Sequence, residues 1–329
     1  MRLQCFQSLP AVGCDLGRVA QGAQVVLEQF RVGKDRKVGF VSWIFTDPDV
    51  RGWGLGQRLI EAALAHFEAE GCNEVSACVE GYNTSSAKLF ATRGFSILSP
   101  GEQLRRYRLG IIPYWWHAFH FMDVGHFLWV KPGATEPDSP ALQWLGTWLA
   151  NVLLLWLAVW RQRALGGANL WAVPATLLVL FGLRTLAMWA TAKARGLTVR
   201  FRAWESSVPL VAAIALAFGG YFPFTGSLYP VKVRYRYREL VRDLGPMALG
   251  GSLTVLALAA LSGAALRWGW APGLTALWQP LFQIARVLGL LDTVVAFFPL
   301  ASYNGRRLWD WHRGVWAALS LAAVALMFV

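Results

Sequence analysis

Five long apolar runs in the second half of the chain restrict the folds that are open to it. An α-helix needs about 20 apolar residues to cross the hydrocarbon core of a bilayer, where it satisfies its own backbone polar groups. The chain of 329 residues is 56% hydrophobic and contains 18 Trp, so it is more apolar than a typical soluble protein. Residues 141–329 therefore predict an α-helical polytopic membrane domain with spans at Ala141–Trp160, Ala168–Trp189, Gly245–Leu266, Gln279–Leu300 and Gly314–Val329.

A sixth apolar run, Val208–Tyr221, is shorter and is followed by Pro223 and Gly226. Its length suits a re-entrant segment near 208–226 better than a full crossing. Basic residues are concentrated between the apolar runs, which favours contact with anionic membrane lipid over nucleic acid. If the chain crosses the membrane five times, most of these basic residues lie on the same side of the membrane as the N-terminus. The positive-inside rule therefore predicts an integral membrane protein whose N-terminal domain is cytoplasmic.

A glycine-rich turn organises the first third of the chain. Gly52, Gly54 and Gly56 stand between an apolar strand pattern that ends at Thr46 and an amphipathic helical pattern that starts at Gln57. Because glycine has no Cβ, consecutive backbone N–H groups can point into one concavity at the helix N-terminus, where the helix dipole favours an anion. The turn therefore predicts a binding site for a diphosphate.

Strand and helix patterns alternate around this turn. Helices are expected at Gln57–Glu70 and Ser85–Thr92. The expected strands are Met1–Ser8, Ala23–Val32, Lys37–Thr46, Val75–Val79, Phe95–Leu98 and Gln103–Leu109.

Two motifs in this region resemble the GNAT N-acetyltransferases, which use acyl-CoA. The pyrophosphate loop of that family matches Arg51, Gly54 and Gly56, and a second block matches Asn83, Ala87, Leu89, Gly94 and Phe95. The resemblance covers roughly residues 1–110. It implies an α+β GNAT-like domain with a mixed sheet, and acetyl-CoA as a substrate. The family's cofactor contacts fall here on Ile44, Thr46, Arg51, Gly52, Trp53, Gly54, Leu55, Gly56 and Asn83.

The proton-handling positions of that family carry other residue types here. Many members place a Glu five residues before the Asn and a Tyr seven residues after it, where this chain has Cys78 and Phe90. Acetyl transfer to an amine needs a base for the amine and a proton for the leaving thiolate. The catalytic residue stays open among Glu80, Glu28 and Cys78. Cys78 is either an acyl-carrying nucleophile or a small buried strand residue.

Motifs in the membrane half resemble the intramembrane zinc metalloproteases of the site-2 protease family, over roughly residues 141–320. At the positions of that family's first His, Glu, second His and Asp, this chain has Arg184, Thr185, Met188 and Asn304. Zinc hydrolysis needs imidazole and carboxylate ligands and a Glu base. We therefore expect a protease-shaped scaffold that holds no metal and cleaves no peptide. Within it, Arg286 and Asp292 are expected to pair, because an unpaired charge in a membrane is costly.

Residues 111–140 are rich in aromatic side chains, which favour the headgroup layer, and they predict an interfacial segment and linker. His117, His120 and His126 stand in this segment. They are interpreted either as a metal or haem site or as members of an aromatic belt.

Two functions follow from these patterns. The first is a membrane-anchored acetyltransferase that transfers an acetyl group from acetyl-CoA to an amine. The alternative is a non-catalytic subunit of a membrane-protein complex, in which a pseudo-acetyltransferase is fused to a pseudoprotease. In either case we expect a prokaryotic plasma membrane protein that binds no nucleic acid.

Overall fold

The computed structural model describes residues 23–33, 35–122, 124–133, 138–163, 171–231, 236–297 and 299–329. The predicted strand Met1–Ser8 lies outside these residues. The described chain divides into two compact units. The first takes in described residues within Met1–Val79, Ser85–His120 and Phe127–Pro137, and the second those within Glu80–Thr84, Phe121–His126 and Asp138–Val329.

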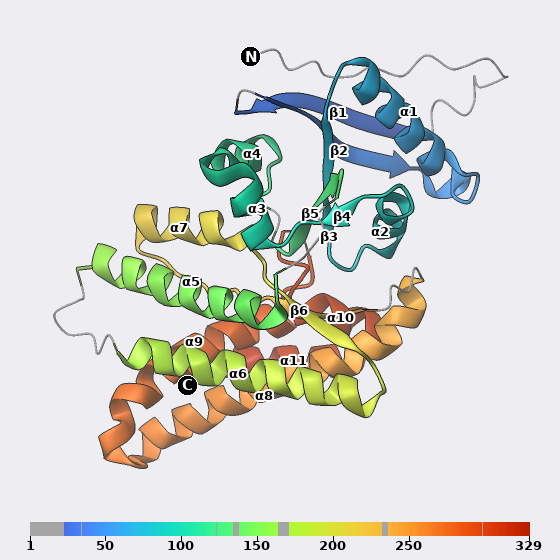
Figure 1. Cartoon of the computed structure of the whole chain (residues 1–329). Coiled ribbons are helices and arrows are strands. Elements are labelled where there is room, and N and C mark those ends of the chain that lie inside the picture. The colour runs from blue at the N-terminus through green and yellow to red at the C-terminus, as the bar shows by residue number, and fades with distance from the viewer. Residues whose placement is uncertain are drawn as a thin grey trace. The chain divides into compact units, whose positions relative to one another are not determined.

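A five-stranded mixed sheet forms the frame of the first unit (Figure 1), with the strand order β1-β2-β3-β5-β4. β1 and β2 form an antiparallel hairpin, β2 runs parallel to β3, and β4 is antiparallel to β5. The predicted α+β domain with a mixed sheet is confirmed. The strands are β1 (Ala23–Val32), β2 (Arg36–Thr46), β3 (Glu74–Glu80), β4 (Ser96–Ile97) and β5 (His126–Lys131). The helices are α1 (Leu55–Ala69), α2 (Thr84–Ala91), α3 (Pro100–Tyr107) and α4 (Ile111–His117).

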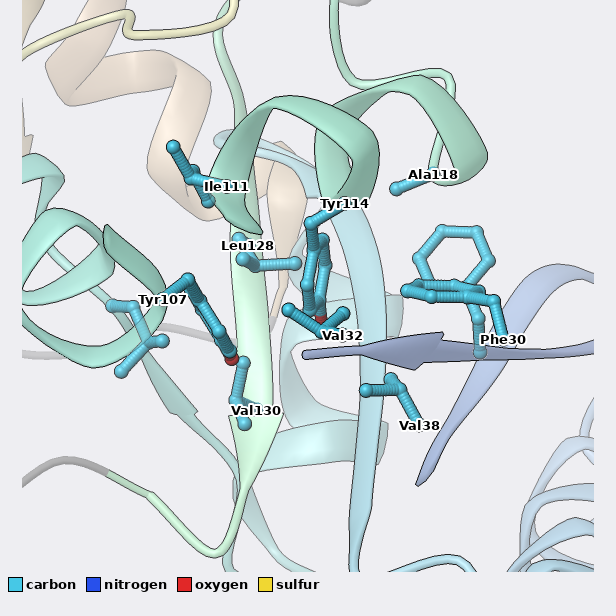
Figure 2. Packing of buried hydrophobic residues seen from close by; sticks show 11 residues of the cluster. Phe30, Val32, Val38, Tyr107, Ile111, Tyr114, Ala118, Leu128 and Val130 are labelled. Carbon is cyan, nitrogen blue, oxygen red and sulfur yellow. The ribbon is translucent and has the colours of Figure 1, made fainter. Parts of the chain in front are cut away.

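Alternating side chains divide the core of this unit between the two faces of the sheet. On one face Ile60 and Phe67 of α1 pack against Val41 and Ala77. On the other face residues of α3 and α4 pack against β1, β2 and β5. Figure 2 shows Tyr114 pointing from its helix toward the strands of this second layer. The two layers hold β2 and β3 between them, and these strands carry the candidate site.

Residues Gln103–Leu109, predicted as a strand, are instead mostly helical, within α3 and the turn after it. The sequence Ser99-Pro-Gly-Glu102 starts α3, because Pro is favoured in the first helical turn and the Glu102 carboxylate accepts from the Ser99 N–H, at 2.8 Å, and from its hydroxyl. This capping box overrides the alternation that suggested a strand.

Removal of this helix cap should lower the free energy of unfolding of the first unit. Glu102→Ala leaves the buried Ser99 N–H without its acceptor and is expected to destabilise the first unit by about 1 kcal/mol. Chemical denaturation of the detergent-solubilised full chain measures this change. A variant as stable as the wild type would contradict the capping role.

The aromatic segment after residue 110 contributes to the first unit. Its residues Tyr114 and Leu128 are buried in the sheet core, because apolar positions of α4 and β5 face that core. The domain boundary predicted at residue 110 therefore falls inside the unit that the sheet defines. Contact of the exposed Trp116 and Phe119 with a membrane interface stays a prediction.

The second unit is dominated by long apolar helices. Among the described residues, four helices are long and apolar enough to cross a membrane, which supports a membrane protein. The helices and the small hairpin of this unit are α5 (Pro140–Arg161), α6 (Ala172–Ala194), β6 (Val199–Arg202), α7 (Ser207–Phe218), β7 (Ser227–Pro230), α8 (Tyr237–Trp268), α9 (Thr275–Thr293), α10 (Asn304–Trp311) and α11 (Arg313–Ala325).

Two shorter apolar helices occupy the remaining predicted membrane segments. α7 has 12 residues and lies where a re-entrant segment is predicted, and α11 has 13 residues and lies where the fifth span is predicted. The left-handed Gly219 ends α7, which agrees with a segment that stops short of a full crossing. The number of crossings stays a prediction.

Candidate functional site

The turn between β2 and α1 has an open backbone conformation. A 3-10 turn at Pro48–Val50 is capped by Asp47, whose side chain accepts from the Asp49 N–H at 3.1 Å. Gly52 and Gly54 then adopt φ angles of +89° and +74°, which favour glycine. Arg51 fastens the turn to the end of β2 by donating from Nε to the Thr46 carbonyl at 3.3 Å.

The amide groups of this turn are available to a ligand. Within the part of the chain that the structure describes, no protein acceptor receives a hydrogen bond from the N–H groups of residues 52–56. A Cβ added at Gly52, Gly54 or Gly56 would meet no other atom within 4 Å. The N-terminus of α1 follows directly and adds positive potential. The arrangement can bind the oxygen atoms of a diphosphate.

Strands β2 and β3 pair along only part of their length. Their parallel register joins Val38–Val41 to Glu74–Ala77, while β2 continues to Thr46. The register of β2 with β1 shifts just beyond this point, leaving Ser42 as the extra residue of a bulge. The Ser42 hydroxyl donates to Glu28 on β1 at 2.6 Å. Ile44 and Thr46 lie beyond this bulge, on a stretch of β2 that pairs with β1 but is not paired with β3 in the described register.

Cys78 is the first residue of β3 after the last pair with β2. Its sulfur lies 3.3 Å from Nδ1 of His120, which is fully buried just beyond α4. The two residues are 42 positions apart, and no local pattern in the sequence connects them. The candidate Glu28 is instead held by Ser42 in the hairpin.

The three histidines of the aromatic segment do not assemble a metal site. Among the described residues no group of His, Cys, Asp and Glu is arranged to hold a metal ion. His117 stacks on Phe30, with ring centroids 4.9 Å apart, while His120 contacts Cys78. His117 ends α4, and His126 begins β5.

Comparison with known proteins gives a match in the first third of the chain. Residues 12–95 match the profile of the acetyltransferase (GNAT) family. This part of the chain is similar to a GNAT acetyltransferase domain. The turn at 51–56 and strands β2 and β3 all lie within the matched residues of this domain.

Curated relatives agree with this assignment over a limited length. Mycothiol acetyltransferase of Thermobispora bispora is 38% identical over 74 residues, which cover 22% of this chain and 25% of that protein. A mycothiol acetyltransferase of Saccharopolyspora erythraea is 40% identical over 58 residues, covering 18% and 19%. Glucosamine 6-phosphate N-acetyltransferase 1 of Oryza sativa subsp. japonica is 30% identical over 80 residues, covering 21% and 48%. The chain thus matches about a quarter of the mycothiol acetyltransferases and about half of the rice enzyme.

A solved structure, the NatC complex bound to Gag peptide and CoA, is similar to 33% of this chain and 60% of its own chain. The TM-score is 0.26 and the sequence identity is 20%.

Glu80 and Asn83, two further residues singled out by the GNAT resemblance, belong to the second unit. The Asn83 N–H donates to the Glu80 carbonyl at 3.0 Å, and the Glu80 side chain accepts from the Tyr82 N–H at 3.2 Å. Tyr82 anchors this segment in the second unit by stacking on Tyr229 and by lying under the Arg307 guanidinium, 4.2 Å from the ring centroid. The roles of Glu80 and Asn83 in the chemistry stay predictions.

Burial gives Glu80 a testable pH signature. Desolvation raises the pKa of Glu80, and the nearby Arg307 and Arg306 offset this only in part. The folded chain then binds this proton more tightly than the unfolded chain, whose Glu pKa is about 4.3, so stability falls as pH rises from that value through the folded-state pKa. Glu80→Gln is therefore expected to raise the melting temperature at pH 8 and to leave it unchanged below about pH 4. A lower melting temperature at pH 8 would show that the charged Glu80 is a needed partner of Arg307.

Two of the positions compared with a zinc protease, Arg184 and Asn304, meet at the buried Asp292 in the second unit. Arg184 binds Asp292 through Nε at 2.6 Å and Nη2 at 2.9 Å, and Asn304 donates its side-chain amide to the same carboxylate at 3.1 Å. Met188 lies beside Asn304 across Gly251, while the Thr185 hydroxyl accepts from Trp144. The Arg184 guanidinium therefore occupies the centre of this cluster, bound to Asp292. The likeness to site-2 proteases itself stays a prediction.

The expected pairing of Arg286 with Asp292 is wrong. The Arg286 guanidinium instead contacts Gln283 and lies over the Phe282 ring at 5.1 Å. Arg286 and Asp292 are six positions apart in α9, which places their side chains on different faces of that helix, and Asp292 faces Arg184 on α6.

Proposed function

We propose that this protein is a membrane-anchored acetyltransferase that transfers an acetyl group from acetyl-CoA to an amine. The observation that carries the proposal is the turn at residues 52–56, whose amide groups and surrounding space are free for a diphosphate. A GNAT domain supplies the reaction class.

The donor fits the geometry along β2. With the diphosphate at the turn, Arg51, Trp53 and Leu55 flank it, and the pantetheine arm can extend along Ile44 and Thr46 toward the point where β2 and β3 separate. Edge strands offer unpaired N–H and C=O groups to an extended partner, and the pantetheine amides can use them. The thioester would then lie near Val41 and Cys78, at the end of the paired region.

The acceptor is proposed to be an amine with an apolar body. Trp43, Phe45 and Trp53 are exposed on the strand and turn that flank the site, and Trp43 is 69% exposed. Large exposed aromatic side chains of this kind suit a ligand or surface with apolar parts. The similarity to a protein named as an N-acetyltransferase supports an amino group as the acceptor. Asn83 and Glu80 are retained as candidates for positioning and proton transfer.

The membrane half is proposed as an anchor with five crossings and a cytoplasmic N-terminal domain, on the site-2 protease scaffold without its metal. The bacterial sources of two relatives support a prokaryotic plasma membrane. The exposed aromatic residues of the membrane half suit contact with lipid and with partner subunits of a membrane complex. The open turn leaves room for acetyl-CoA, which the acetyltransferase requires and which a chain with a closed turn could not bind.

The test is an acetyltransferase assay on the full chain in detergent or liposomes. Release of CoA from acetyl-CoA is followed with a panel of amines that includes polyamines, amino sugars and long-chain alkylamines. The proposal predicts amine-dependent release well above background hydrolysis, highest for acceptors with an apolar portion. Binding of acetyl-CoA without transfer to any amine would support the non-catalytic alternative.

A further inference from the structure

We propose that Cys78 and His120 form a nucleophilic pair that carries the acetyl group as a thioester on Cys78 before the acceptor amine takes it. This inference rests on the proposed function and names a covalent intermediate for it. The observation that supports it most directly is the distance of 3.3 Å between the Cys78 sulfur and Nδ1 of His120.

The position of Cys78 along the strand matches the expected position of the thioester. The last β2–β3 pair joins Val41 to Ala77, so Cys78 stands at the point where the strands separate. From Thr46, next to the diphosphate turn, back to Val41 is about 16 Å of strand at 3.3 Å per residue. An extended pantetheine arm can span such a length. The reactive carbonyl carbon would then arrive beside Cys78.

The orientation of Cys78 brings it to the histidine. Its neighbours Ala77 and Val79 pack on the α1 side of the sheet, whereas Cys78 packs with the cluster that α3 and α4 cover. Cys78 is only partly buried, as a residue that meets a ligand must be. A cysteine adjacent to an imidazole base is the usual arrangement for thiol nucleophiles.

His120 is held in place by its surroundings. Its backbone N–H donates to the Trp115 carbonyl at 3.0 Å, and the Trp115 indole N–H donates to Gln103 at 2.9 Å. The preceding Phe119 has a φ angle of +49°, which is unfavourable for a bulky residue. Such strain is retained where a structure needs a side chain in a particular place. Here it turns the chain so that the imidazole faces the sheet.

The reaction is balanced without an added reagent. Nδ1 of His120 accepts the thiol proton while the Cys78 sulfur attacks the acetyl carbonyl carbon. The bond from that carbon to the CoA sulfur breaks, and the CoA thiolate takes the proton from the imidazolium. In the second half the amine nitrogen attacks the acetyl group on Cys78. The carbon–sulfur bond breaks, and the amine proton returns to the Cys78 thiolate through His120.

The test traps the intermediate on the full chain in detergent. The chain is incubated with acetyl-CoA without an amine, quenched in acid, digested and analysed by mass spectrometry. We expect close to one acetyl group per chain on the peptide that contains Cys78, removable by neutral hydroxylamine and lost when an accepted amine is added. Cys72, a second free cysteine on the other side of the fold core, provides the matched control, and Cys72→Ala should acetylate like the wild type.

Two variants separate this proposal from the proposed function. Cys78→Ala should still bind acetyl-CoA by calorimetric titration, but lose the label and at least about 100-fold in kcat. His120→Asn should bind acetyl-CoA normally and slow the labelling of Cys78 by a similar factor. Full turnover by Cys78→Ala, or turnover by the wild type without label on Cys78, would overturn the nucleophilic pair and leave the acetyltransferase proposal standing. Failure of the wild type to bind acetyl-CoA would overturn both.

Discussion

Gly54→Glu is expected to weaken acetyl-CoA binding by at least about 100-fold, equivalent to about 2.7 kcal/mol, while the chain stays folded. The added carboxylate would enter the open space at the turn and repel the diphosphate that the free amides are proposed to bind. Calorimetric titration of the detergent-solubilised chain with acetyl-CoA measures the change.

The chain provides a closely matched control at the other end of the same helix. Gly71 follows α1, has a φ of +70° against +74° for Gly54, and a Cβ there also meets nothing within 4 Å. Gly71→Glu therefore imposes the same backbone cost, about 1–2 kcal/mol, and the same charge, away from the turn. We expect Gly71→Glu to bind acetyl-CoA like the wild type. Equal losses in the two variants would mean that the effect comes from stability rather than from the site.

Arg184→Met is expected to destabilise the second unit by about 3–5 kcal/mol, because it leaves the buried Asp292 carboxylate without its counter-charge. Both side chains are at most 1% exposed, and two hydrogen bonds join them. The measurement is chemical unfolding in detergent, followed by the fluorescence of the Trp-rich second unit. Arg184→Met/Asp292→Leu should recover most of the loss, since replacing both charges removes the unpaired one.

An exposed ion pair serves as the comparison. Arg195 contacts Asp243 at 3.3 Å, with the Arg195 side chain 40% exposed. Arg195→Met is expected to cost less than about 1 kcal/mol, because exposed pairs contribute little. If Arg184→Met lowered the free energy of unfolding no more than Arg195→Met does, the buried cluster would not stabilise the second unit as proposed.

The sequence predicted those parts of the fold that local rules determine. The hairpin was expected at Ala23–Val32 and Lys37–Thr46 and is found at Ala23–Val32 and Arg36–Thr46, because alternation and the turn between the strands fix its register. The helix after the glycine turn begins at Leu55 rather than Gln57. The open turn itself follows from residues that are contiguous in the chain. α3 was predictable in principle, since the capping box Ser99–Glu102 is readable from the sequence.

The contact of the proposed nucleophilic pair and the buried ion pair depend on tertiary packing instead. Cys78 meets His120 across 42 positions, and Arg184 meets Asp292 across 108. Periodicity places each residue on a strand or helix, but it does not say which side chain of another element lies opposite. For the same reason the sequence predicted the wrong partner for Asp292, which binds Arg184 and not Arg286.

Calorimetric titration shows whether the turn at residues 52–56 binds the diphosphate of a CoA thioester, as proposed. The full chain is titrated with acetyl-CoA and, in parallel, with acetyl-pantetheine, which has the same thioester but no diphosphate. We expect saturable, one-to-one binding of acetyl-CoA and binding of acetyl-pantetheine that is at least about 100-fold weaker. Equal affinity for the two compounds, or no binding of acetyl-CoA, would mean that the turn does not bind the diphosphate.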